Sequence, residues 1–288
     1  MTPPQRTVDS RDILGEGPFW DSIRERLWWF DIKGRKLSWY DPGSASHGAH
    51  DLAFRASAGC VRTDGRLLLA TEQGLGAFDP ISADFHMISP QDLGEGFRSN
   101  DGQIDIKGRF WWSSMDDDGG RRPGSIFRSD RDGHNELVFT GVHIPNSLAV
   151  SPDGRVLYQA DSLKRTILAH DLTPEGLPGA SRIFAESVGE AGAPDGSAMD
   201  AEGYLWNAQW GAWRVVRYAP DGSVDRIIEV PVQQPSCCAF GGVGLSTLFI
   251  TSAREGLSDQ DLQAQPDAGG LFNFDPGVCG LALPRFAG

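Results

Sequence analysis

Short apolar runs, each preceded by a charged or glycine-containing turn and followed by a polar break, recur along the chain. Six of these runs are similar in length and composition, and they lie at 26–29, 66–69, 109–112, 155–158, 204–207 and 247–250. Their starts are separated by 40, 43, 46, 49 and 43 residues. Short strands that repeat about every 40 to 50 residues are typical of β-propellers, in which each repeat forms one blade. The pattern therefore predicts an all-β chain folded as a six-bladed β-propeller.

The repeats leave no room for a second module, so we expect a single domain over residues 1–288. In the first repeat the apolar runs predict strands at 13–20, 27–32 and 36–40. We expect the N-terminal segment, about residues 6–13, to complete the last blade, because closing the ring removes exposed strand edges. Residues 115–123 and 255–269 interrupt the rhythm, and we expect them to form long loops over one end of the ring, as candidates for a lid.

The formal net charge of −13 argues against a nucleic-acid partner, because binding to phosphates needs a basic surface. The same charge is compatible with a site for a cation. No apolar run approaches the roughly 18 residues of a membrane span, and the first residues do not resemble a signal peptide. We expect a cytoplasmic protein that acts as a monomer, without a membrane partner. We also expect its four cysteines to be reduced, namely Cys60, Cys237, Cys238 and Cys279.

Oxygen-bearing side chains stand at the same distance before the apolar run in four of the six repeats. Asn100, Asn146 and Asp195 each lie nine residues before the start of a run, and Glu16 lies ten residues before one. These positions open the innermost strand of each predicted blade. Because the blades of a propeller are related by rotation about one axis, the four side chains are expected to converge at one end of that axis.

Two carboxylates and two carboxamides at one place are the ligand set of a hard divalent cation. Carboxylates that lie close together in a partly buried site repel one another unless a cation or a proton intervenes. In the remaining two repeats the same position holds Ser57 and Cys238. The sequence therefore predicts one divalent metal ion bound by Glu16, Asn146 and Asp195. These residue types do not distinguish among calcium, zinc, magnesium, manganese and iron(II).

Further candidate residues lie beside these positions. Arg98 and Asn100 are two residues apart, so on a strand their side chains share one face, and an arginine offers several fixed donors to hydroxyl or carbonyl oxygens. Asp101 either holds Arg98, lies beside the ion or opens an Asp-Gly turn. Trp210 follows a predicted strand closely and is a candidate to line a sugar pocket. His143 is the histidine nearest to these positions, and a structural role is its simpler interpretation.

Several phrases of the chain together resemble one family. These are LGEGP at 14–18, RSNDG at 98–102, PNS at 145–147, APDG at 193–196 and PSCCAFGG at 235–242. On these phrases the chain is similar to the regucalcin (senescence marker protein)/gluconolactonase family of six-bladed propeller hydrolases. The phrases around Trp206 and Trp210 resemble the bacterial sugar lactonases of that family. The agreement extends in unbroken order over nearly the whole chain.

The resemblance implies roles for individual residues. The family's metal ligands fall on Glu16, Asn146 and Asp195, which agrees with the argument from spacing. Its substrate-binding arginine and asparagine fall on Arg98 and Asn100. Where animal members place a glutamate near the substrate, this chain has the shorter Asp118.

The resemblance also implies a reaction, the hydrolysis of sugar lactones such as gluconolactone, xylonolactone or arabinonolactone to the aldonic acid. Asp195 is the candidate to accept a proton from the attacking water, and Asp101 is the next candidate. Two alternatives stay open. One is a calcium-binding regulatory propeller. The other is an organophosphate or aryl-ester hydrolase on the same scaffold, which would need a histidine near the metal, and only His143 could supply it.

Overall fold

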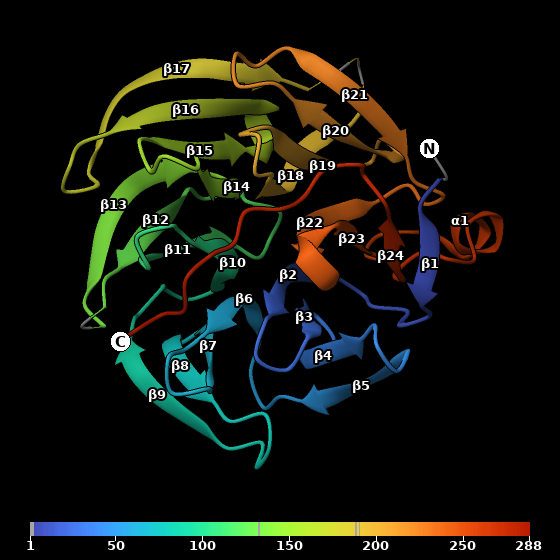
Figure 1. Cartoon of the computed structure of the whole chain (residues 1–288), viewed down its shortest axis with the longest axis horizontal. Coiled ribbons are helices and arrows are strands. Elements are labelled where there is room, and N and C mark those ends of the chain that lie inside the picture. The colour runs from blue at the N-terminus through green and yellow to red at the C-terminus, as the bar shows by residue number, and fades with distance from the viewer. Residues whose placement is uncertain (1–2, 132, 188, 190) are drawn as a thin grey trace.

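Six four-stranded sheets surround a central axis in the computed structural model, which describes residues 3–131, 133–187, 189 and 191–288. Neighbouring strands within each sheet are antiparallel. One strand of each sheet lies beside the axis, and the other three follow outward to the rim (Figure 1). This arrangement confirms the predicted six-bladed β-propeller. The single domain over residues 1–288 stays a prediction.

Each blade is named here by its order along the chain, and its strands are given from the axis outward. Blade 1 consists of β2 (Gly15–Asp21), β3 (Arg26–Asp31), β4 (Lys36–Asp41) and β5 (Ser46–Asp51). Blade 2 consists of β6 (Ala56–Val61), β7 (Leu67–Thr71), β8 (Gly74–Phe78) and β9 (Phe85–Pro90). Blade 3 consists of β10 (Phe97–Ile104), β11 (Phe110–Asp116), β12 (Gly124–Ser129) and β13 (Asn135–Val142). Blade 4 consists of β14 (Pro145–Val150), β15 (Val156–Asp161), β16 (Thr166–Leu172) and β17 (Pro178–Glu186). Blade 5 consists of β18 (Ala193–Met199), β19 (Leu205–Trp210), β20 (Arg214–Tyr218) and β21 (Val224–Glu229). Blade 6 consists of β22 (Pro235–Gly241), β23 (Thr247–Ser252), β24 (Leu271–Phe274) and β1 (Gln5–Val8).

Blade 6 combines strands from both ends of the chain. Its rim strand is the N-terminal β1, which pairs antiparallel with β24 so that Gln5 lies opposite Asn273 and Arg6 opposite Phe272. The expectation that the N-terminal segment completes the last blade is confirmed. The strand ends at Val8, however, and does not continue to residue 13. The first and last strands of the ring are therefore held together by backbone hydrogen bonds.

Aspartates stabilise the turns between the two inner strands of several blades. Asp105 accepts hydrogen bonds from the backbone nitrogen of Arg109 at 3.1 Å and from the indole nitrogen of Trp111 at 2.9 Å. Asp200 likewise accepts from the indole of Trp206 at 2.9 Å. A short carboxylate that accepts from nearby backbone nitrogens favours a turn. The same group satisfies the buried indole of the following strand, so turn and strand support each other.

The hydrophobic core lies between adjacent blades. Trp28 and Phe30 of β3 pack with Leu67 and Leu69 of β7, and all four are at most 1 % exposed. Burial of each such side chain contributes roughly 1.5–3 kcal/mol. The rim strands alternate exposed and partly buried residues, as β9 does, because only one of their faces packs on the ring.

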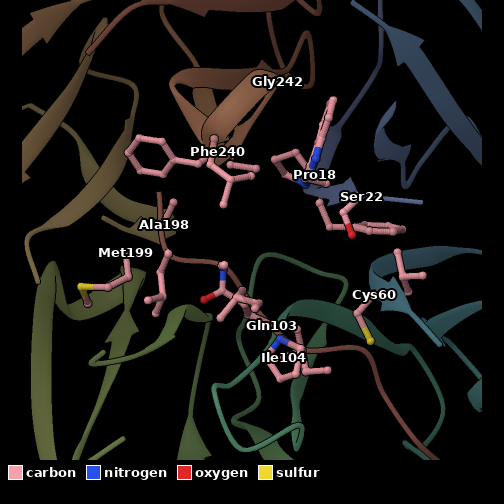
Figure 2. Close-up of a pocket in the computed structure, with 18 of the residues that line it drawn as sticks. Pro18, Ser22, Cys60, Gln103, Ile104, Ala198, Met199, Phe240 and Gly242 are labelled. Carbon is pink, nitrogen blue, oxygen red and sulfur yellow. The ribbon is translucent and has the colours of Figure 1, made fainter. Parts of the chain in front are cut away.

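The C-terminal segment crosses the ring at the ends of the inner strands (Figure 1). It forms isolated bridges through Gly280 to Asp200 and through Phe286 to Arg62, and Phe286 is fully buried. A cavity of about 480 Å³ lies between this segment and the inner strands. Figure 2 labels several residues around it, among them Pro18, Cys60, Gln103, Ile104, Met199 and Phe240.

The helices of the described residues are few and short. They are the 3-10 helices η1 (Ser162–Lys164) and η2 (Val243–Leu245) and the α-helix α1 (Asp259–Ala264). None of them has the length and apolar character needed to cross a membrane. Of the two predicted loops, 255–269 contains α1, whose start is capped by Ser258. The other is shorter than expected, because β11 continues to Asp116.

Candidate active site

Every inner strand carries a β-bulge near its start. The register between the first and second strands of each blade shifts between residues 16 and 19, 56 and 58, 99 and 102, 146 and 149, 194 and 197, and 235 and 238. A bulge adds one residue to a strand and changes the direction of its side chains, which is common next to active sites. The positions singled out in the sequence lie at these bulges.

Glu16 and Asn146 are the last paired residues before their bulges. The residue that follows each of them has a positive φ, 54° at Gly17 and 59° at Ser147. Gly17 can hardly be replaced, because a Cβ atom there would collide with the carbonyl oxygen of Ser57. A serine at positive φ is uncommon and costs on the order of 1–3 kcal/mol, so the surrounding fold must hold Ser147 there.

Asn100 and Asp195 lie inside their bulges. The last paired residues are Ser99 in β10 and Pro194 in β18, so both side chains are one residue later in register than Glu16 and Asn146. The four residues therefore do not share one position in the register, as the sequence predicted, but occupy two adjacent positions. The two kinds of bulge nevertheless bring all four side chains to the same place.

The register also corrects the position proposed for blade 6. Ser57 lies inside the bulge of β6, as counting predicted. Cys238 lies beyond the bulge of β22 and pairs with Ile250, and Ser236 occupies the position that corresponds to Asp195. The reason is a longer hairpin: the paired residues 235 and 252 are 17 apart, whereas 194 and 209 in blade 5 are 15 apart.

The bulges surround a cavity of about 450 Å³ at this end of the axis. Six of the predicted site residues line it, namely Glu16, Arg98, Asn100, Asn146, Asp195 and Trp210. Asp101 and Asp118 are not among the described residues that line it. Five polar residues outside the predicted site set also do so, namely Lys33, Asp117, Ser162, Arg165 and Glu255.

Asp195 is a buried carboxyl group and Glu16 a partly buried one, and both line the cavity. Among the described residues neither forms an ion pair, and Glu16 accepts its hydrogen bond from the backbone nitrogen of Gly17 at 3.0 Å. Burial, together with the charge of Asp101, raises the pKa of Glu16 to about 8. Burial and the charges of Glu16 and Asp101 raise the pKa of Asp195 well above its usual range. A bound cation would remove this repulsion.

A chain of hydrogen bonds orients the side-chain amides. Arg98 donates to Oδ1 of Asn100 at 2.7 Å, and Nδ2 of Asn100 donates to Oδ1 of Asn146 at 2.9 Å. Nδ2 of Asn146 donates to Ser162 at 2.9 Å, and Ser162 donates to the carbonyl of Pro194 at 2.7 Å. Oδ1 of Asn146 accepts one hydrogen bond in this chain, from Asn100, so its second lone pair is left for a cation in the cavity.

The donor set of Glu16, Asn146 and Asp195 fits a hard divalent cation. No group of three or more His, Cys, Asp and Glu side chains within the described ranges is close enough to hold a metal by itself. An ion at these residues would therefore need the amide oxygen of Asn146 in addition to the two carboxylates, with water completing its shell. All of these ligands are oxygen atoms, which is the preference of hard cations.

Arg98 is held by Asp117, which takes the place predicted for Asp118. Nε of Arg98 donates to Asp117 at 2.8 Å. The side chain of Asp118 is 70 % exposed and pairs with Arg121 at 2.9 Å. The acidic segment thus reaches the cavity one residue earlier than the resemblance implied, because the turn after β11 directs Asp118 away from it.

Asp101 lies beside the cavity without lining it. Its carboxylate accepts hydrogen bonds at 2.8 Å from the backbone nitrogens of Leu148 and Gly102, so it connects the bulges of blades 3 and 4. Burial raises its pKa to about 6. Asp101 forms no hydrogen bond with Arg98, and its charge acts on Glu16 and Asp195 instead.

None of the histidines in the described part of the chain lines the cavity. Nδ1 of His143, the candidate for a histidine beside the metal, is hydrogen-bonded to the carbonyl of Gly120 at 2.7 Å. His143 therefore connects the segment before β14 to the turn after β11, and the structural interpretation of this residue accounts for its contact.

Four of these five polar residues share a position in their blades. Lys33, Asp117, Ser162 and Glu255 each follow the end of the second strand, within three residues of its last residue. In an antiparallel pair the end of the second strand lies beside the start of the first. The residues after each second strand therefore lie at the same end of the ring as the bulges, and this signal would have found them.

A family model described as the SMP-30/Gluconolactonase/LRE-like region matches residues 14–254. An L-arabinolactonase from Azospirillum brasilense is 39% identical over 286 residues, which cover 98% of this chain and 94% of that protein. A 6-deoxy-6-sulfogluconolactonase from Pseudomonas putida is 35% identical over 286 residues, covering 98% and 97%.

A solved structure of a calcium-binding protein, regucalcin, from Agrobacterium tumefaciens has the same fold, with a TM-score of 0.93. The two sequences are 34% identical, and the match covers 99% of this chain and 97% of that one. The likeness therefore includes all six blades and both ends of the ring.

Proposed function

Since this chain belongs to the SMP-30/gluconolactonase/LRE-like family, we propose that it is a metal-dependent hydrolase that opens sugar lactones to aldonic acids. It is a lactone-hydrolysing enzyme, a carboxylic-ester hydrolase, as are its relatives that are named lactonases. The substrates we propose are aldonolactones of the gluconolactone, xylonolactone or arabinonolactone type.

One observation carries the metal dependence. Asp195 and the partly buried Glu16 line the cavity without forming an ion pair with any described residue, and the oriented amide oxygen of Asn146 lies with them. The chemistry that a divalent ion supplies when bound is polarisation of the lactone carbonyl and activation of water. We assign Glu16, Asn146 and Asp195 as the residues that would hold this ion.

Asp195 is the candidate to accept the proton of the attacking water. It lines the cavity, whereas Asp101 does not and accepts hydrogen bonds from the backbone nitrogens of Leu148 and Gly102 instead. A general base must lie within hydrogen-bond reach of the proton that it takes, directly or through one water. Asp101 therefore acts in this proposal through its charge, which favours the protonated form of Asp195.

Arg98, Asn100 and Trp210 supply the surface that would position the sugar. Arg98 provides donors, Oδ1 of Asn100 keeps a lone pair as an acceptor, and Trp210 provides an aromatic side chain at the end of β19. Donors and aromatic faces placed around a ring of hydroxyl and C–H groups orient a sugar, and such positioning lowers the barrier for attack on the carbonyl.

The two alternatives predict different results in one experiment. Metal-stripped protein is reconstituted with calcium, zinc, magnesium, manganese or iron(II) in turn, and a pH-drop assay then measures hydrolysis of a panel of aldonolactones and of an aryl ester. We expect metal-dependent turnover of aldonolactones. Calcium binding without turnover of any lactone would support the regulatory alternative, and preferential turnover of the aryl ester would support the other hydrolase.

A further inference from the structure

One nitrogen of Arg98 has no hydrogen-bond partner among the residues that the structure describes. Nε donates to Asp117 at 2.8 Å, and Nη1 donates to the carbonyl of Ser99 at 2.9 Å and to Oδ1 of Asn100 at 2.7 Å. Nη2 forms no hydrogen bond with any described residue, although the side chain is only 6% exposed and lines the cavity. A guanidinium has five N–H donors, so the two on Nη2 are left for a ligand in the cavity.

Lys33 places a second cation at the same cavity. Its Nζ atom lies 2.7 Å from Oδ1 of Asp117 and 3.4 Å from Oε1 of Glu255. An ammonium group has three N–H donors, so one is left when each of these two carboxylates takes one. Lys33 lines the cavity and is 24% exposed, so a ligand can reach this donor.

Asp117 connects the two cations. Its Oδ1 atom accepts from both Lys33 and Arg98, and its Oδ2 atom accepts from Arg55 at 2.7 Å. The backbone nitrogen of Asp117 donates to the carbonyl of Gly96 at 2.9 Å, which fixes the start of the turn. Since one oxygen atom accepts from both cations, the ammonium of Lys33 and the guanidinium of Arg98 lie close together at the cavity.

Arg55 contributes to the order of this cluster without lining the cavity. Its Nε atom donates to Glu72 at 2.7 Å while its Nη1 atom binds Asp117, so blade 2 supports the carboxylate from behind. Burial acts to raise the pKa of Asp117, but the hydrogen bond of Lys33 and the charge of Arg98 lower it below its ordinary value. Asp117 is therefore a stable anion that keeps both cations in place.

We propose that Lys33 and Arg98 form a donor pair that binds two neighbouring hydroxyl oxygens of the substrate, and that Asp117 is the positioning residue for this pair. The inference rests on the proposed function and deepens it, because it names the residues that recognise the adjacent hydroxyl groups of the lactone. Hydrogen bonds from charged donors are about twice as strong as neutral ones. A lactone without hydroxyl groups gains nothing from the donor pair.

The test compares an aldonolactone that the wild type hydrolyses with δ-valerolactone, which has no hydroxyl groups. The variants are Lys33→Met, Asp117→Asn and Asp117→Glu, each assayed after reconstitution with the same divalent ion. Lys164→Met is the matched control, because Lys164 pairs with one carboxylate at 3.4 Å and does not line the cavity. Thermal melting and metal content are measured for every protein.

We expect Lys33→Met and Asp117→Asn to raise KM for the aldonolactone about 10-fold with kcat changed less than about twofold. The kcat/KM for δ-valerolactone should not change, and Asp117→Glu should restore part of the lost affinity. If both lactones are affected equally, or neither is, the donor pair does not exist. Should Asp117→Asn not fold, the partly exposed Lys33→Met decides the result alone.

Failure of the inference is distinguishable from failure of the proposed function. A wild type that opens no aldonolactone refutes the function and the donor pair with it. A wild type that opens aldonolactones, with an unchanged preference over δ-valerolactone in Lys33→Met, refutes the donor pair only.

Discussion

Nδ2 of Asn100 donates a hydrogen bond to Oδ1 of Asn146 at 2.9 Å, across the boundary between blades 3 and 4. Asn100 is a candidate substrate-binding residue, and Asn146 is a candidate metal ligand. The bond orients the amide of Asn146, whose nitrogen is bound by Ser162 on its other side. Residues that orient ligands in this way tune metal affinity.

From this bond we expect Asn100→Ala to weaken metal binding as well as substrate binding. Loss of an orienting residue costs about 10-fold in metal affinity or more. Titration calorimetry with each divalent ion alone, without substrate, measures the effect. An affinity equal to that of the wild type would show that Asn146 is oriented by Ser162 alone.

Substitutions of Asp195 should separate metal binding from proton transfer. Asp195→Ala removes a ligand oxygen and is expected to lose most of the bound metal. Asp195→Asn keeps one oxygen that can bind the ion but cannot accept a proton, so its rate should fall much further than its metal occupancy. Metal content by elemental analysis is compared with kcat/KM on the same samples. A fully loaded Asp195→Asn enzyme with the wild-type rate would remove Asp195 as the base.

Metal removal should lower the thermal stability of the ring. An ion that binds only the folded state stabilises it by about 2.7 kcal/mol at a free concentration 100-fold above Kd. For a chain of this size we expect Tm to rise by roughly 5 °C when metal is added back to stripped protein. Differential scanning calorimetry measures this shift, and Asp195→Ala is the control that should not respond. Equal responses of the two proteins would place the ion elsewhere.

Asp12 should make stability depend on pH. Its carboxylate is 4% exposed and accepts a hydrogen bond from the indole of Trp29 at 2.8 Å. Burial raises its pKa from 3.8 to about 7. The folded state thus holds this proton more tightly than the unfolded chain does. The contribution of Asp12 to the free energy of unfolding is therefore fully present below about pH 4 and is lost as pH rises through 7.

Asp12→Asn keeps an acceptor for the indole but carries no charge. We therefore expect it to be more stable than the wild type at pH 8, by on the order of 1–4 kcal/mol, and equally stable at pH 4. Urea denaturation at several pH values measures the difference. A difference that does not vary with pH would mean that Asp12 does not titrate in this range.

The repeat of apolar runs was sufficient to predict the fold, because the two inner strands of each blade are buried on both faces. Thus the predicted strand 27–32 corresponds to β3 (Arg26–Asp31), which is almost wholly buried. Apart from β1 in the last blade, the rim strands were not predicted. β5 (Ser46–Asp51) contains few apolar residues because it packs on one side only, so its pairing with β4 is decided by the neighbouring strand.

The sequence by itself also determined that Glu16, Asn100, Asn146 and Asp195 meet. Each position depends on the length of one hairpin, which is a local property. Because the blades are related by rotation about one axis, equivalent positions meet at one end of that axis. Only the tertiary structure decided which of the residues that follow the second strands complete the site. Lys33 and Asp117 come from different blades, and the choice of Asp117 over Asp118 depends on the direction of one turn. Backbone direction in a turn is set by its packing against neighbouring blades, as with the contact of His143 to Gly120, and such contacts leave no periodic signal in the chain.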